Sequence, residues 1–396
     1  MVGVWTNEEQ AVSVGHSVDP AEWQDGFDDL MGRIAGRFAR VEPRRRAREF
    51  VLGLLSDLPR KNCWTLAEQA GHAQPGGMQQ LLNRAVWDAD GVRDDLRGLV
   101  VEHLAEPDAV LVVDETGDLK KGSATVGVQR QYTATAGRIE NSQVAVYLAY
   151  AGRSAHALID RELYLPRSWI GDEARCRAAA VPENTGFATK PQLAAAMVTR
   201  ALDAGTPARW LTGDEVYGGD PHLRATLEQR QIGYVLAVSC HHRILTGPGR
   251  FRADVLATRI PRTAWQKMSA GDGAKGYRYY DWALLDLASD DHPGAASAAV
   301  PPKPAHRRTR LLPLLFTRTR AAARAGPGCR TALERGGVLP DQQGTNRAGQ
   351  ASGPPLALLE TLGHTGDARP RLPHRHRGPR AHPACRRQPA DTHYLP

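Results

Sequence analysis

The spacing of apolar residues divides the chain into parts with different structure. From about residue 20 to residue 104, apolar positions recur every three or four residues, as in "AEWQDGFDDLMGRIAGRFAR" and "RRRAREFVLGLLSDL". This period predicts amphipathic helices. We therefore expect a flexible N-terminus over residues 1–19 and a helical region, a candidate DNA-binding region, over residues 20–106.

From Pro107 the pattern predicts strands that alternate with helices. "AVLVVDET" is a continuous apolar run typical of a strand buried on both faces, and "TVGVQRQYTAT" and "SQVAVYLAYAG" alternate with period two, which predicts a hairpin. "KPQLAAAMVTRALDAG" predicts a helix that ends at Gly205, and "DPHLRATLEQRQ" a helix that begins near Pro221. "RWLTGDE", "GYVLAVSC" and two segments around a Gly-rich turn after Arg262 predict further strands. This order predicts an α/β fold with a mixed sheet flanked by helices.

The periodic pattern stops at Gly294. Residues 295–396 contain 14 of the 27 prolines, 17 Lys/Arg and 5 Asp/Glu, which leaves 34 basic and 38 acidic residues in residues 1–294. The basic charge therefore belongs to the tail, and it does not make the remainder of the chain a general nucleic-acid binder. A Pro/Arg-rich segment without apolar period predicts a low-complexity, disordered tail.

Composition narrows the class of protein. No apolar run is long enough for a transmembrane helix, and the N-terminus lacks the pattern of a signal peptide. The five cysteines include no CxxC pair, which argues against a zinc site or a disulfide framework and suits a reducing cytoplasm.

Two acids are the strongest candidates for chemistry. Asp114 and Asp214 each follow a predicted strand of the same sheet, and ligands bind at this edge of open α/β sheets. Two such carboxylates can hold Mg²⁺ or Mn²⁺ for phosphodiester cleavage; the alternative is that they only terminate strands. Because side chains alternate along a strand, Glu115 and Glu215 are expected to point away from the site of their neighbours. "KKGSAT" is not a P-loop, and "DETGD" does not match the nucleophile loop of haloacid dehalogenase-like phosphatases.

Longer motifs carry a family resemblance. "VLVVDETGDLKKGSATVGVQRQYTATAGRIENSQVAVYLAY" and "RWLTGDEVYGGDPHLRATLEQR" resemble bacterial insertion-sequence transposases of the DDE class, in the branch numbered seven hundred and one. The resemblance implies an RNase H-like catalytic core over residues 107–245, a β-rich insertion over residues 246–294, and DNA cutting and joining at element ends with divalent metal. It also implies Asp114 and Asp214 as the first two catalytic acids.

The same resemblance gives partners and contacts. Double-stranded DNA, as transposon ends and target, is the expected partner of a homodimer at the nucleoid in the bacterial cytoplasm. The candidate DNA contacts are Lys120, Lys121, Arg130 and Arg138 at the hairpin, and Trp265, which could stack on an unpaired base. Exposed surface charge for the cations, and a structural role for Trp265, are the alternatives.

The family's third acid is missing from the chain as translated. The expected R-x-x-x-E pattern, with Lys seven residues later, has no match, and Glu334 and Glu360 lack that neighbourhood. One permitted codon set for "ALERGGVLP", read one nucleotide later, gives RWNVEEFF, and the same frame continues to the expected lysine. We therefore infer a frameshift near residues 294–295 and an inactive or impaired enzyme. The rival functions are a non-catalytic DNA-binding remnant that inhibits transposition, and an unrelated metal-dependent phosphodiesterase.

Overall fold

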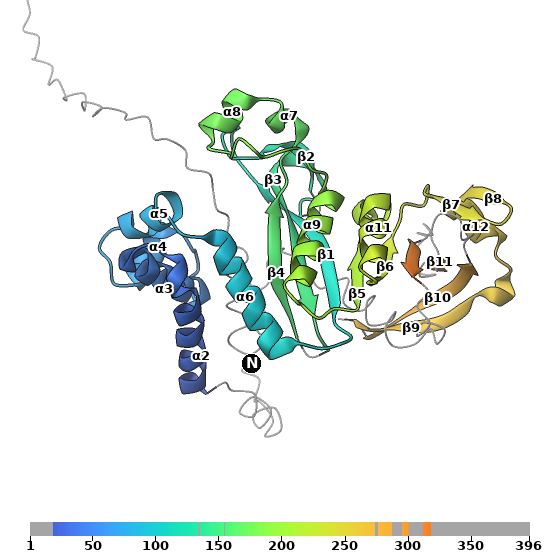
Figure 1. Ribbon diagram of the computed structural model, residues 1–396, viewed down its shortest axis with the longest axis horizontal. Coiled ribbons are helices and arrows are strands. Elements are labelled where there is room, and N and C mark those ends of the chain that lie inside the picture. The colour runs from blue at the N-terminus through green and yellow to red at the C-terminus, as the bar shows by residue number, and fades with distance from the viewer. Residues whose placement is uncertain are drawn as a thin grey trace, which may run out of the picture.

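A computed structural model describes residues 19–133, 135–153, 155–273, 276–286, 295–300 and 312–317 of the chain. The helical region begins at Pro20, and Figure 1 shows it at one end of the molecule, beside the sheet. Its elements are α2 (Pro20–Arg33), η1 (Ile34–Arg37), α3 (Val41–Leu55), α4 (Cys63–Gln69), α5 (Gly76–Asn83) and α6 (Ala89–Leu104). The helices that the apolar period predicts are confirmed.

Strands and helices alternate from Val110 onward. The strands of the core are β1 (Val110–Leu119), β2 (Gln129–Thr133), β3 (Arg138–Ala151), β4 (His156–Leu163), β5 (Trp210–Gly213) and β6 (Gly233–Ala237). The helices are α7 (Arg167–Ile170), α8 (Glu173–Ala178), α9 (Lys190–Asp203), α10 (Glu215–Gly218) and α11 (Pro221–Gln229). β1 pairs antiparallel with β3, which pairs with β4, while β1, β5 and β6 run parallel. This mixed sheet flanked by helices is consistent with the expected RNase H-like fold.

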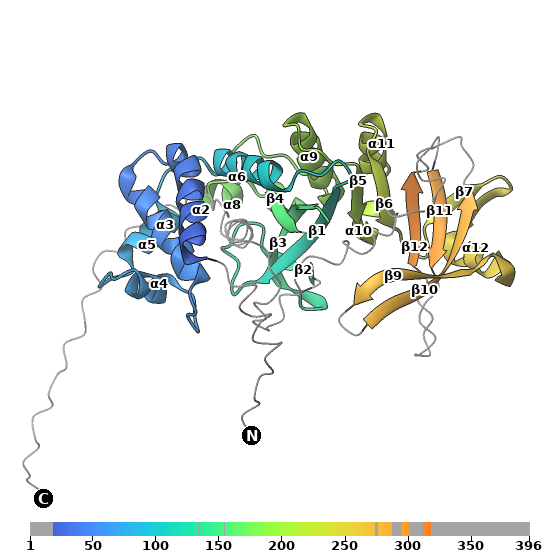
Figure 2. The same ribbon diagram turned by 90° about the horizontal axis from the view of Figure 1, so that it is seen from below.

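The second half of the sheet lies beyond β6. β7 (Arg243–Thr246) and β8 (Gly249–Arg252) form a separate hairpin, followed by α12 (Ala253–Arg259) and η2 (Arg262–Ala264). β9 (Gln266–Gly273) and β10 (Gly276–Asp286) pair antiparallel, as the sequence predicts. With β11 at Ala295–Val300 and β12 at Leu312–Thr317, the strand order is β2-β3-β1-β5-β6-β12-β11-β10-β9 (Figure 2), so β2 and β9 lie at opposite edges.

Two segments of the tail depart from the expected absence of regular structure. β11 (Ala295–Val300) and β12 (Leu312–Thr317) are six-residue strands, and β12 pairs antiparallel with β6. The short apolar run "LPLLFT" can use the open backbone edge of β6, because that edge offers unpaired N–H and C=O groups. The remainder of the tail lies outside the described residues.

Local signals in the sequence explain where the helices begin. Asp19, Asp88, Thr189 and Asp220 each accept a hydrogen bond from a backbone N–H of the helix that follows, which satisfies one of its free donors. Thr189 and Gln192 complete a capping box at α9. After α9 the chain turns at Gly205, whose φ of +77° favours glycine.

The main core lies between the sheet and the helices α6, α9 and α11. Leu111, Val146, Leu148, Leu211 and Tyr234 from the strands are less than 2% exposed, and they pack in one cluster with residues of these helices. Burial of this kind contributes about 25 cal/mol per Å² of apolar surface, which makes this cluster the main source of stability.

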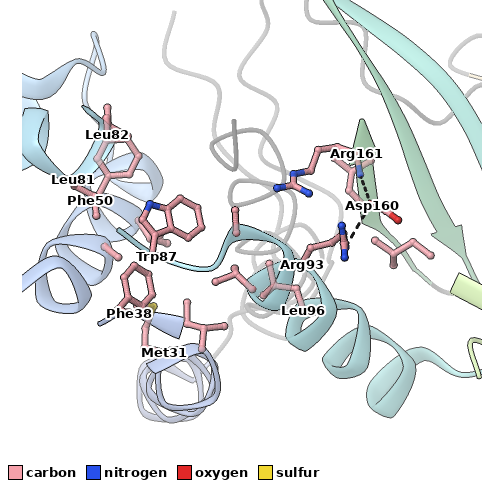
Figure 3. Close-up of a pocket in the computed structure, with 17 residues that line it drawn as sticks. Met31, Phe38, Phe50, Leu81, Leu82, Trp87, Arg93, Leu96, Asp160 and Arg161 are labelled. Carbon is pink, nitrogen blue, oxygen red and sulfur yellow. Dashed lines mark hydrogen bonds and ion pairs between the residues drawn. The ribbon is translucent and has the colours of Figure 1, made fainter. Parts of the chain in front are cut away.

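A pocket marks the seam between the helical region and the core (Figure 3). Its wall is mainly apolar, with Phe38, Phe50, Leu82 and Trp87 among the lining residues, and Asp160 of β4 closes one side. None of the site residues expected from the sequence lines it.

Candidate metal-binding site

Adjacent parallel strands position Asp114 and Asp214. In the register of β1 and β5, Val113 lies opposite Gly213. The residues that follow them, Asp114 and Asp214, therefore lie at the same level of the sheet. Asp214 then caps α10, and its Oδ1 accepts a hydrogen bond from the Val216 N–H at 2.8 Å. The expectation that the two acids meet at one sheet edge is consistent with this register.

One detail of the expectation is wrong: Asp114 does not end its strand. β1 continues to Leu119, because the longer strand β3 pairs with it as far as Ser142. Asp114 lies where β1 separates from β5 and keeps only its antiparallel neighbour. The backbone of β1 is therefore paired with β3 both before and after Asp114. This pairing fixes the direction of the Asp114 side chain more firmly than a position at a strand end would.

Burial and like charge disfavour ionisation of both acids. Loss of hydration is the main cause that raises the pKa of Asp114, to about 6, and the charges of Asp214 and Glu115 are smaller contributions to the same rise. The pKa of Asp214 is also raised, first by burial of its carboxyl group and then by the charges of Glu115 and Glu215. The Asp214 residue as a whole is exposed, so water screens this effect.

Glu115 lies beside the two acids but has its own partners. Its Oε1 lies 2.7 Å from Nζ of Lys190 at the start of α9, and its Oε2 accepts a 2.6 Å hydrogen bond from the Tyr217 hydroxyl. Burial and the charge of Glu115 raise the pKa of Tyr217, so this hydroxyl stays a donor. Glu115 thus faces Lys190 and Tyr217, and its charge still reaches both aspartates.

The Glu115–Lys190–Tyr217 cluster was missed by reasoning from the sequence. Lys190 and Tyr217 are 75 and 102 positions from Glu115 in the sequence, and lysines and tyrosines occur throughout the chain. The available signal was Thr189-Lys190-Pro191, which marks the start of a helix but not the direction of its lysine.

The arrangement leaves two carboxylates without a cation of their own. Among the described residues, neither Asp114 nor Asp214 forms a salt bridge, and Lys190, whose charge lowers the pKa of both acids, is bound to Glu115. Hard oxygen donors of this kind suit Mg²⁺ or Mn²⁺. Within those same residues, however, no three His, Cys, Asp or Glu side chains gather as a complete metal site. The donor chemistry fits a divalent ion, and the set of ligands is partial.

The candidate DNA contacts fall into separate places. Lys120 and Arg130 lie beside Asn141, whose carbonyl accepts the Lys120 N–H at 2.9 Å and which lies opposite Arg130 in the β2–β3 ladder, and Lys121 directly follows Lys120. Lys121 and Arg130 are exposed, while the Lys120 ammonium lies 3.6 Å from Asp118.

Arg138 and Trp265 lie apart from that group. Arg138 is at the other end of the β2–β3 ladder, opposite Thr133, and pairs with Glu140 at 2.7 Å. Trp265 is partly buried and precedes β9, at the opposite edge of the sheet from β2. The structure therefore groups three of the five candidates; Glu334 and Glu360, the acids considered for the third position, lie outside the described residues.

An RNase H-like sheet with two acids on adjacent parallel strands defines a class of metal-dependent nucleic-acid enzymes, and comparison with known proteins agrees with that class. The sequence profile of the DDE superfamily endonuclease family matches residues 33–259, and the chain belongs to this family. Enzymes of this superfamily generally use divalent metal ions. In the described residues, no helix is long and apolar enough to cross a membrane.

A curated relative narrows the resemblance. The chain is 29% identical over 198 residues to the protein named "Probable transposase for insertion sequence element IS701" from Microchaete diplosiphon. The match covers 49% of this chain and 48% of the relative, so the chain spans about half the length of the relative it matches. The resemblance to insertion-sequence transposases of this branch, drawn above from sequence motifs, is confirmed.

Proposed function

We propose that this chain derives from a transposase that cuts and joins DNA at insertion-sequence ends, and that Asp114 and Asp214 are two of its metal ligands. The observation that carries the proposal is the pair of adjacent, partly desolvated carboxylates that no cation neutralises among the described residues. A bound divalent ion would offset their repulsion, activate water and stabilise the leaving oxygen. The parent chemistry is hydrolysis of a phosphodiester to free a 3′-hydroxyl, which then attacks the target strand.

The residues of the chain divide this work. Asp114 and Asp214 would hold the metal, while Lys190 and Tyr217 fix the position of Glu115 beside them. Lys120, Lys121 and Arg130 present positive charge at the hairpin, where it can contact DNA phosphates. We further propose a cytoplasmic, nucleoid-associated homodimer, which size-exclusion chromatography with light scattering tests directly.

As translated, the chain is proposed to be impaired because the third acid is absent. The test is nicking of a supercoiled plasmid that carries the ends of the element, in Mg²⁺ or Mn²⁺, with the chain as it stands and with a gene read one nucleotide later from codon 295. We expect cleavage from the frame-restored protein and little from the chain itself. Loss of cleavage in Asp114→Asn and Asp214→Asn would support the assignment of ligands, and undiminished cleavage would refute it.

The second candidate is a non-catalytic DNA-binding protein that occupies element ends. It is favoured by the incomplete set of metal ligands within the described part of the chain. Binding to end-containing duplexes without nicking, in both the chain and its frame-restored form, would establish it. Nucleotide sequence around codon 294 decides the frame itself: stop codons in the shifted frame would remove the frameshift hypothesis.

A further inference from the structure

Three helices of the N-terminal region form a small unit with its own core. Phe50 of α3, Leu66 and Ala67 of α4, and Met78 and Leu81 of α5 are buried against one another, in a cluster distinct from the main core. Figure 1 shows α3, α4 and α5 at the outer end of the molecule, away from β5 and β6. The unit, residues 41–86, can therefore offer its outer surface to a partner without disturbing the sheet.

The turn between α4 and α5 is fixed to α3. Nε2 of His72, in the turn, lies 2.8 Å from Oε2 of Glu49, and it also contacts the guanidinium of Arg46. Gly77 lies directly on Arg46: a Cβ atom there would be 2.6 Å from Arg46 Nε. The turn itself uses Gly71, with φ of +77°. These contacts fix the connection between α4 and α5 against α3.

The outward face of α5 carries the side chains that read base edges. Met78 and Leu81 point into the core of the unit, while Gln79, Gln80 and Asn83 are exposed, followed by exposed Arg84. Gln and Asn can bond adenine through two atoms, and Arg can do the same with guanine. From Gln69 to Trp87 the sequence has no acidic residue that would repel phosphates.

The start of α4 is suited to the DNA backbone. Arg60 and Lys61 are exposed just before this helix, and Trp64 in its first turn is 64% exposed. Residues 41–86 hold 7 Lys/Arg and 4 Asp/Glu, whereas residues 1–294 as a whole hold 34 basic and 38 acidic residues. Positive charge is thus concentrated on this unit within a body that is otherwise slightly acidic, which is the electrostatic pattern of a DNA-contacting module.

We propose that α4 and α5 are a helix–turn–helix unit that recognises the sequence of duplex DNA, with Gln79, Gln80, Asn83 and Arg84 of α5 in the major groove. Arg60 and Lys61 contact phosphates and set the position of the unit. B-form DNA is the expected partner, because the major groove of an RNA duplex is too narrow and deep to admit a helix. The proposal rests on the proposed function only for the identity of DNA as partner.

The test is selection of duplexes bound by the full-length chain from a random-sequence pool, without divalent metal, followed by fluorescence anisotropy with the selected duplex. We expect Gln79→Ala and Asn83→Ala each to weaken binding about 10-fold and to relax sequence preference at one position. Asn184→Ala, on an exposed loop far along the chain, is the matched control and should change neither quantity. Arg60→Ala and Lys61→Ala should weaken binding to all sequences alike and reduce the salt dependence of binding by about one ion.

Two glycines with open space around them, Gly76 and Gly32, give a second, independent test variant and its control. A Cβ atom at Gly76, the first residue of α5, would meet no atom within 4 Å. A carboxylate at this position is also stabilised by the helix dipole. Gly76→Glu should therefore fold normally and yet repel DNA. Gly32→Glu, on the exposed side of α2 with equal space around it, should leave binding unchanged.

Failure of this proposal is distinguishable from failure of the proposed function. If the α5 variants keep the affinity and the selected sequence of the wild-type chain, the helix–turn–helix assignment is wrong, whatever the nicking assay shows. Selection of no sequence, or a preference for duplex RNA, also overturns it. If the α5 variants lose sequence preference while nicking by the frame-restored protein is undiminished in Asp114→Asn, α5 is supported as the reading helix and the assignment of the metal ligands is refuted.

Discussion

Removal of the Asp114 charge should stabilise the metal-free protein. Asp114 is partly buried next to Asp214, and the replacement Asp114→Asn keeps an oxygen that can accept the Glu115 N–H, now 2.8 Å from Asp114 Oδ1. The amide cannot ionise, so the cost of placing a second negative charge at this point of the sheet disappears. At pH 7.5, without divalent metal, we expect the variant to unfold at a higher temperature than the wild-type chain.

The magnitude follows from the pKa of this carboxyl group. Its pKa rises from the ordinary value of 3.8 to about 6 in the folded state. Between these values the folded chain binds more protons than the unfolded chain, so the free energy of unfolding falls as the pH rises through that window. At about 1.4 kcal/mol per pH unit, the full penalty reaches about 3 kcal/mol above pH 7, and water near the site makes about 1–3 kcal/mol the expected range.

Divalent metal should reverse the order of thermal stability of the wild-type chain and Asp114→Asn. A ligand that binds only the folded state stabilises it by about 2.7 kcal/mol at a concentration 100 times its dissociation constant. Mg²⁺ or Mn²⁺ should therefore raise the melting temperature of the wild-type chain, and raise that of Asp114→Asn much less. The variant that is more stable without metal thus becomes the one that gains least from it.

The assay is thermal unfolding at pH 5 and pH 7.5, with and without metal, monitored by circular dichroism. Asp118→Asn is the control, because Asp118 lies on the same strand but is 58% exposed and has only a 3.6 Å contact with Lys120. The reasoning is refuted if Asp114→Asn is less stable than the wild type at pH 7.5 without metal, or if the difference does not shrink at pH 5.

Three further substitutions test how the site is supported. Lys190→Met should cost about 1–3 kcal/mol, because it leaves the partly buried Glu115 carboxylate without its ammonium; urea unfolding measures this, with exposed Lys121→Met as control. Asp160→Asn should cost about 1–3 kcal/mol, because the fully buried Asp160 side chain loses its charged pairing with Arg200 at 2.8 Å while Arg200 keeps Glu162 as a partner. The same titration of Asp203→Asn, in a surface pair, should show little change. Gly218→Ala should cost about 3 kcal/mol, because its Cβ would lie 1.9 Å from the Ala237 carbonyl oxygen, whereas Gly219→Ala, with no atom closer than 4.0 Å, should be tolerated in a thermal melt.

The sequence predicted those elements whose signals are local. The helical period and Gly205 predicted α9, Pro221 predicted the first turn of α11, and the apolar run before Asp114 predicted β1. β4 was missed because "HALIDREL" places Asp160, Arg161 and Glu162 inside a strand, which is unusual in a buried position. Arg200 of α9 and Arg93 of α6 compensate Asp160, and nothing near β4 in the sequence announces either partner.

The same limit applied to the site. That Asp114 and Asp214 meet could be inferred, because parallel neighbours bring residues of one level together. How far β1 continues past Asp114 depends on the length of β3, and which side chain faces Glu115 depends on how α9 packs on the sheet. Both are properties of tertiary contacts, which residue spacing does not encode.

The charge balance of the site argues for a ligand and against a purely structural role of the two aspartates. If strand termination were their only purpose, the fold would gain stability by placing Lys190 between them, yet this ammonium is bound to Glu115 at 2.7 Å. The acids instead have pKa values that are raised by burial and by the charges of neighbouring carboxylates, Glu115 in both cases, and this lowers the stability of the fold when no cation is bound. Such strain is characteristic of positions that bind a charged partner. A divalent cation is the partner whose charge and oxygen preference would relieve it.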